Sequence, residues 1–76
     1  MAEALDWSER TKRLLKAELK RADISYEALA ARLTELGMAE TNASVANKIS
    51  RGGFPASCFL ASMKAIGRDV VRVDDL

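Results

Sequence analysis

Apolar residues recur at spacings of three and four along most of this chain, as they do on a helix that buries one face. The clearest run follows Ser25, and its apolar positions fall on one stripe: Tyr26, Leu29, Ala30, Leu33 and Leu36. Ser25 can cap the first turn, because a serine hydroxyl accepts a hydrogen bond from an unpaired backbone amide. Gly37 follows the last apolar residue, as expected at a helix end. The pattern predicts a helix that opens at Ser25 and stops at Gly37.

A second helix is predicted after the turn Met38-Ala39-Glu40, with Thr41 or Asn42 as its cap and Arg51-Gly52-Gly53 as its end. Its positions divide into two sets: Val45, Ala46 and Ile49 are predicted to face inward, and Ser44, Asn47, Lys48 and Arg51 to face outward. Two short helices joined by a tight turn have the layout of a helix-turn-helix, in which the first helix supports a second one in a DNA groove.

A further helix is predicted on each side of this pair. The first runs from about Asp6 or Trp7 to Arg21, with Asp6 or Ser8 as its cap, and its apolar stripe comprises Trp7, Leu14, Leu15, Leu19 and Ala22. The other, Ala56–Ile66, follows a turn in which Pro55 is expected at the first helical position. Its apolar positions are Phe59, Leu60, Met63 and Ile66, and Phe54 and Cys58 are expected to join the core.

The stretch after Gly67 loses the helical period. Val70, Val71 and Val73 are β-branched and favour a short extended segment, whose open edge would offer one route to a dimer. The whole pattern predicts an all-α fold: a compact, repressor-like bundle of about four helices in a single domain, residues 1–76. Residues 1–6 are expected to be frayed, and residues 69–76 form a tail that holds the short extended segment.

Composition restricts the class of protein further. Seventy-six residues lie near the lower limit for a self-sufficient core, so dimerisation would add stability. The chain has one cysteine, Cys58, and no histidine, which excludes an internal disulfide and argues against a zinc site. A reduced, cytoplasmic setting fits this usage. No apolar run approaches the roughly 20 residues of a membrane span.

Charge is informative in its distribution rather than in its sum of +1. From Asn42 to Arg68 the chain has no acid and four bases: Lys48, Arg51, Lys64 and Arg68. A basic block that begins with the second predicted helix favours contact with nucleic acid, and the alternative is an ordinary solvated face.

Catalytic patterns are missing from the sequence. Without histidine no Ser/His/Asp or Cys/His set can form, and Gly52-Gly53 lacks the spacing and the lysine of a phosphate-binding loop. The carboxylates fall mainly at the two ends and on helix positions expected to be exposed, so no acid/base pair is indicated. We expect no enzyme activity, no cofactor and no metal.

The residues also carry a resemblance. The run Ser25–Ala30, Leu33 and the run Ile49–Gly52 resemble the Cro/phage-repressor type of helix-turn-helix family. More narrowly, Tyr26-Glu27-x-Leu29-Ala30 followed by Asn47–Gly52 looks like a small uncharacterised bacterial family, a domain of unknown function, and the likeness covers roughly residues 7–67. Two features depart from the repressor pattern: Tyr26 replaces the usual glutamine, and the turn around Met38–Thr41 is about three residues longer.

DNA binding by such a helix-turn-helix would divide its contacts by residue type. Base edges would be read by Asn42, Ser44 and Asn47, since asparagine can make a two-point contact with adenine. Phosphates would be held by Lys48 and Arg51 and by the backbone amides at Ser25 and Tyr26. Each has a structural alternative: Asn42 is also a suitable N-cap, and bases near a helix C-terminus favour the helix dipole without any ligand.

The sequence therefore predicts a DNA-binding protein, a small bacterial transcriptional regulator that acts as a dimer on double-stranded DNA. The alternative is a protein-interaction module, such as an antitoxin-like partner-binding protein, on the same helical scaffold. Exposed apolar residues near Tyr26, Met38 and Val45 would favour the alternative. An unobstructed basic face around Lys48 and Arg51 would favour DNA.

Overall fold

The computed structural model describes residues 6–76, apart from the side chain of Asp75, and these residues form four α-helices and one short C-terminal helical turn. Their bounds are α1 (Trp7–Ala22), α2 (Tyr26–Glu35), α3 (Asn42–Arg51), α4 (Ala56–Ile66) and the 3₁₀ turn η1 (Val73–Asp75). The predicted all-α bundle is confirmed. The expected fraying of residues 1–6 falls mostly on residues 1–5, which lie outside the described part, whereas Asp6 is ordered as the N-cap of α1.

Side-chain caps define where three of the helices begin. The Asp6 carboxylate accepts a hydrogen bond from the Glu9 amide, and the Ser25 hydroxyl accepts one from the Ala28 amide. Thr41 caps α3, so the alternative cap, Asn42, is instead the first helical residue. Pro55 also differs from its prediction: it is the N-cap of α4 rather than its first helical residue.

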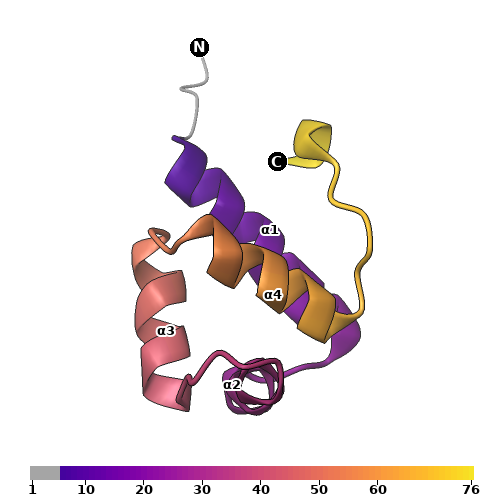
Figure 1. Ribbon diagram of the computed structural model, residues 1–76. Coiled ribbons are helices and arrows are strands. Elements are labelled where there is room, and N and C mark those ends of the chain that lie inside the picture. The colour runs from indigo at the N-terminus through magenta and orange to yellow at the C-terminus, as the bar shows by residue number, and fades with distance from the viewer. Residues whose placement is uncertain (1–5) are drawn as a thin grey trace.

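The helices form a closed arrangement around one core. Helix α2 packs against α3 and α4, and α1 packs against the same two helices. Figure 1 shows α2 end-on while α3 lies in the plane of the view, so the two helices cross rather than run side by side. The core contains these buried side chains: Leu15, Leu19, Leu29, Ala30, Leu33, Val45, Ile49 and Met63.

Four predicted core positions are wrong: Trp7, Ala22, Leu36 and Leu60 are exposed. Each lies at a helix end or on a helix side that no neighbouring helix covers. Trp7 begins α1, with its ring 4.9 Å from the Arg10 guanidinium carbon, and Leu36 follows the last residue of α2. Leu60 is on the outer side of α4, whose buried side carries Cys58, Ser62 and Met63 instead.

The C-terminal segment contains no strand in the part the structure describes: residues 68–72 form neither helix nor sheet, and Val73 begins η1. Figure 1 shows this segment leaving the end of α4 and turning back. Val71 packs on the core, and the Arg68 guanidinium lies 3.5 Å from the Glu18 carboxylate, which Arg21 also contacts at 3.2 Å. Glu18 is buried, which corrects the expectation that the acids within the helices are exposed.

Candidate nucleic-acid interface

The outer face of α3 is the first element of the candidate site. Val45 and Ile49 are buried, and at about 3.6 residues per turn the opposite side of the helix carries Ala43, Asn47, Ser50 and Arg51. All four residues are exposed, and so is Asn42 at the start of the helix. We call Ala43, Asn47, Ser50 and Arg51 the α3 outer face; Asn42, three residues before Val45, is exposed because it begins the helix. The α3 outer face presents amide, hydroxyl and guanidinium groups, and α3 contains no acid.

Arg51 is the free cation of this face. Within residues 6–76 it takes part in no ion pair and no hydrogen bond through its side chain. Its position in the last turn of α3 is stabilised by the helix dipole. A phosphate at this position would therefore displace no partner of Arg51 from the described part of the chain.

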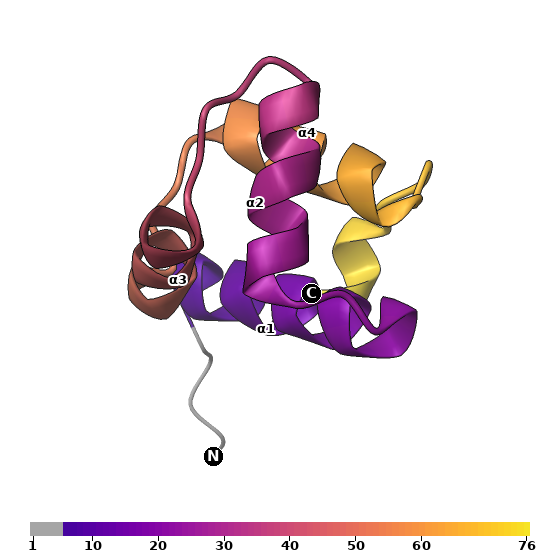
Figure 2. The same cartoon turned by 90° about the horizontal axis from the view of Figure 1, so that it is seen from below.

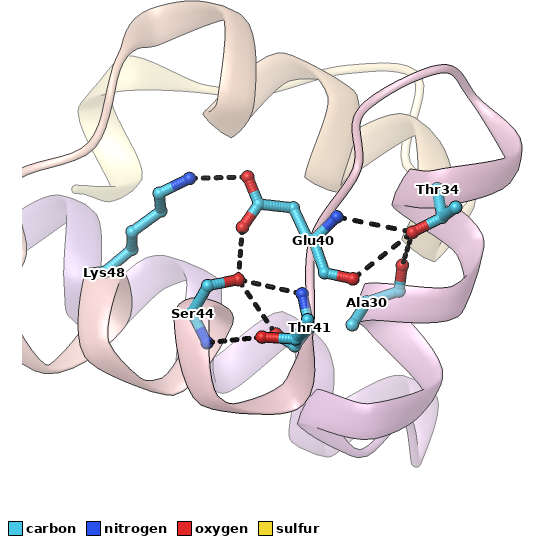
Figure 3. Close-up of polar contacts among 6 residues, drawn as sticks. All are labelled: Ala30, Thr34, Glu40, Thr41, Ser44 and Lys48. Carbon is cyan, nitrogen blue, oxygen red and sulfur yellow. Dashed lines mark hydrogen bonds and ion pairs between the residues drawn. The ribbon is translucent and has the colours of Figure 1, made fainter.

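Ser44 and Lys48, by contrast, are engaged inside the chain (Figure 3). The Ser44 hydroxyl accepts a hydrogen bond from the Thr41 amide at 2.8 Å and donates one to Glu40 Oε1 at 2.6 Å. Lys48 Nζ forms an ion pair with the other carboxylate oxygen of Glu40. Ser44 was predicted to contact a base and Lys48 a phosphate, but both instead bind the carboxylate of Glu40.

This carboxylate belongs to a larger network that joins α2 to α3. The Thr34 hydroxyl donates to the Ala30 carbonyl at 2.9 Å and accepts from the Glu40 amide at 3.3 Å. We call Thr34, Glu40, Thr41, Ser44 and Lys48 the Glu40 cluster (Figure 3). It links the last turn of α2, the six-residue connection 36–41 and the first two turns of α3. The cluster therefore holds α3 in a fixed orientation on α2.

Neighbouring groups and burial shift the pKa values of Glu40 and Lys48. The Lys48 ammonium and then the Ser44 hydroxyl lower the pKa of Glu40, because both stabilise the carboxylate, and burial opposes them only in part. The same hydrogen bond from Lys48 to Glu40 raises the pKa of Lys48. Both groups are charged at neutral pH.

Replacing Glu40 by glutamine should make the stability of the protein less sensitive to acid. The Glu40 pKa is lower in the folded chain than its usual 4.5, so its stabilisation is present above pH 4.5 and is lost as the pH falls through the folded pKa. We expect Glu40→Gln to cost about 1–3 kcal/mol at pH 7. The cost should shrink toward zero below the folded pKa.

Urea unfolding followed by circular dichroism from pH 7 to pH 3 measures this difference. Glu27→Gln is the matched control, because Glu27 is exposed and has no ion-pair partner in the described part of the chain. A constant gap between wild type and Glu40→Gln at every pH would show that the Glu40 carboxylate is not the titrating group.

The remaining predicted phosphate contacts lie at the start of α2. Ser25 is exposed, and its hydroxyl is occupied as an acceptor by the Ala28 amide. Tyr26 is half-buried and packs on the core. No hydrogen bond or ion pair in residues 6–76 joins either residue to the α3 outer face.

The structure also brings the first turns of α1 to the C-terminal end of α3. Lys12 Nζ donates to the Ser50 carbonyl at 3.3 Å, although the two residues are 38 positions apart. Gly52, at the end of α3, is buried and lies against the Ser8 backbone. No local sequence signal predicts these contacts, because they depend on how the two helices pack.

The basic block from Asn42 to Arg68 carries less unneutralised positive charge in the folded chain than its sequence suggests. Lys48 is neutralised by Glu40 and Arg68 by Glu18, both from outside the block. Arg51 and Lys64 remain without an acidic partner in the described part. Among residues 6–76 no group of His, Cys, Asp and Glu side chains is arranged to hold a metal ion. None of the helices described has the length and hydrophobicity needed to span a bilayer.

Comparison with known proteins identifies the family. Residues 7–71 match a domain of unknown function (DUF6471). The match begins with the first residue of α1 and ends with Val71, the last side chain that packs on the core. No curated protein and no solved structure matches the chain. The chain belongs to the DUF6471 family.

Proposed function

We propose that this DUF6471 protein binds double-stranded DNA through the α3 outer face and acts as a dimeric bacterial transcriptional regulator in the cytoplasm. In this proposal α2, the connection and α3 serve as a helix-turn-helix, and α3 enters the major groove. The observation that carries the proposal is the α3 outer face itself. It is exposed, free of acids, and ends at an arginine that has no ion-pair or hydrogen-bond partner among the described residues.

The side chains of this face suit the chemistry of a groove. Asn47 on this face and Asn42 at the start of α3 are exposed amides that can pair with the adenine edge at two points, and each such contact is worth about 1–3 kcal/mol of discrimination. Ala43 and Ser50 are small enough to allow close approach of the helix. Arg51 would hold a phosphate and give binding its salt dependence.

Ser44 and Lys48 would act differently from the other candidates. The Ser44 hydroxyl and the Lys48 ammonium both bind Glu40. A base or a phosphate could therefore contact them only by displacing the Glu40 carboxylate. We therefore assign Lys48 mainly to the support of α3 and Arg51 to the phosphate. Ser25 and Tyr26 remain candidates for a second phosphate through backbone amides.

An exposed apolar patch near Tyr26, Met38 and Val45 would favour the alternative function, a protein-interaction module. Val45 is buried, and Tyr26 and Met38 are half-buried against the core. This region therefore gives no support to a docking site for a partner protein.

Salt dependence of DNA binding separates the roles of the two cations. With a random-sequence duplex and fluorescence anisotropy across a salt series, Arg51→Ala should lower the slope of log affinity against log salt by about 1. Lys48→Ala should leave the slope within the error of wild type while lowering the melting temperature. Lys20→Ala, an exposed lysine near the other end of α1, is the control for a change in net charge.

Three results would contradict these assignments. An equal fall in slope for Lys48→Ala would show that DNA displaces Glu40. A fall as large for Lys20→Ala would show diffuse attraction without a defined face. Failure of the wild-type chain to bind at low salt would refute the DNA proposal.

A further inference from the structure

A second exposed surface lies between the C-terminal parts of α2 and α4. It is a shallow hollow of about 240 Å³ lined by Arg32, Glu35, Leu36, Lys64 and Ala65. Figure 2 shows the C-terminal end of α2 directed away from α1, with α4 beside it. No residue of α3 lines the hollow. We call it the α2–α4 hollow.

Two leucines make this region more apolar than an ordinary surface. Leu36 is 49% exposed at the hollow, and Leu60 is 61% exposed one helical turn before Lys64 on α4. Residues four apart on a helix share one face, so Leu60 extends the apolar surface along α4. The exposed neighbours of Leu60 on that face, Ala56 and Ser57, are small and leave its side chain open to a partner.

The charges at the hollow have opposite signs and are not paired with each other. Glu35 and Lys64 form no ion pair within residues 6–76. Arg32 is fixed in another way, since its guanidinium donates to the Ala65 carbonyl at 2.9 Å. The hollow therefore combines the apolar side chains of Leu36 and Ala65 with an acid from α2 and a base from α4 that are unpaired in the described part, while Arg32 keeps its charge beside a carbonyl.

This combination is self-complementary. In a two-fold symmetric contact the same patch occurs on both copies, so residue i of one copy meets residue j of the other and the reverse. A partner with one sign of charge would leave either Glu35 or Lys64 against a like charge. A second copy satisfies both, because Glu35 of each copy can meet Lys64 of the other.

We propose that two copies of this chain associate through the α2–α4 hollow, with Leu36 and Leu60 at the centre and reciprocal Glu35–Lys64 pairs at the sides. The inference rests on the dimeric part of the proposed function and supplies its contact surface. It leaves the α3 outer face of both copies open. The added burial of apolar surface would also supplement a small core.

Sedimentation equilibrium of the full chain tests this surface. Glu35→Lys and Lys64→Glu should each raise the dimer dissociation constant at least about tenfold, since each places like charges together. The double variant should return to within about threefold of wild type, because the pairs are restored with reversed polarity. Leu36→Glu should also weaken the dimer, and Val70→Gln, at an even more exposed apolar position outside the hollow, should not.

The outcomes separate the surface from the function. A wild-type chain that stays monomeric at about 0.1 mM, where even a weak specific dimer is populated, would overturn both the dimer and its surface. A wild-type dimer that tolerates Leu36→Glu and both charge reversals would overturn the surface alone. DNA affinity measured on the same samples reports the α3 outer face independently. Thermal unfolding of each variant in dilute solution should match wild type, because all of these positions are exposed.

Discussion

Replacing Leu33 by alanine should lower the free energy of unfolding by about 2–5 kcal/mol, the range for deleting a fully buried leucine side chain. Leu33 has 0% exposure and belongs to the core cluster between α2 and its neighbours. A domain of this size has a total stability of only about 5–15 kcal/mol. The variant should therefore melt at least about 8 °C below wild type, at about 4–8 °C per kcal/mol.

Leu36→Ala is the matched control for this substitution. Leu36 was predicted on the same apolar stripe, yet it is half-exposed beyond the end of α2. In dilute solution its loss should cost less than about 1 kcal/mol. Circular dichroism during thermal and urea unfolding measures both variants. Equal losses at the two positions would mean that the end of α2 is packed more tightly in solution than the structure indicates.

Gly52→Ala should produce the second large effect, at the junction of α3 and α1. Gly52 has φ +69°, which costs an alanine about 1–3 kcal/mol. A Cβ atom there would also lie 2.9 Å from the Ser8 carbonyl oxygen, which is backbone and cannot rotate away. The variant must therefore bear the conformational strain and also push α1 and α3 apart.

Gly37→Ala isolates the first of these two costs. Gly37 also has positive φ, but a Cβ atom there would meet nothing within 4 Å. Gly52→Ala should thus be clearly less stable than Gly37→Ala, and it alone should change the fluorescence of Trp7, the single tryptophan, which adjoins Ser8. Equal stabilities, with unchanged fluorescence in both variants, would refute close packing of α1 on Gly52.

The helices were predictable because their signals are local. Apolar spacing, a capping side chain and a terminal glycine all lie within a few residues of the structure that they specify. Helix α4 has the bounds predicted for it, and Asp6, Ser25 and Thr41 cap as expected. Periodicity shows which face of a helix is apolar, but it does not show how far a neighbouring helix covers that face. Trp7, Leu36 and Leu60 are exposed for this reason.

The candidate site was predictable only in part. The outward direction of Asn47 and Arg51 follows from helical spacing. The ion pair of Lys48 with Glu40, by contrast, depends on how the connection between α2 and α3 folds back. Glu40 and Lys48 are eight residues apart, whereas side chains within one helix contact each other at spacings of three and four. Glu18 and Arg68 are separated by most of the fold. Such pairs become visible only after the helices have been placed in space.

The contact between Arg68 and Glu18 bears on where this domain ends. The fourth helix stops at Ile66, yet a chain cut after Gly67 would leave the buried Glu18 carboxylate with one arginine instead of two and would uncover the core beneath Val71. The smallest autonomous unit thus extends a few residues past the last α-helix, to the point where the family match also ends. A truncation or a fusion made directly after the last α-helix would therefore remove part of the fold.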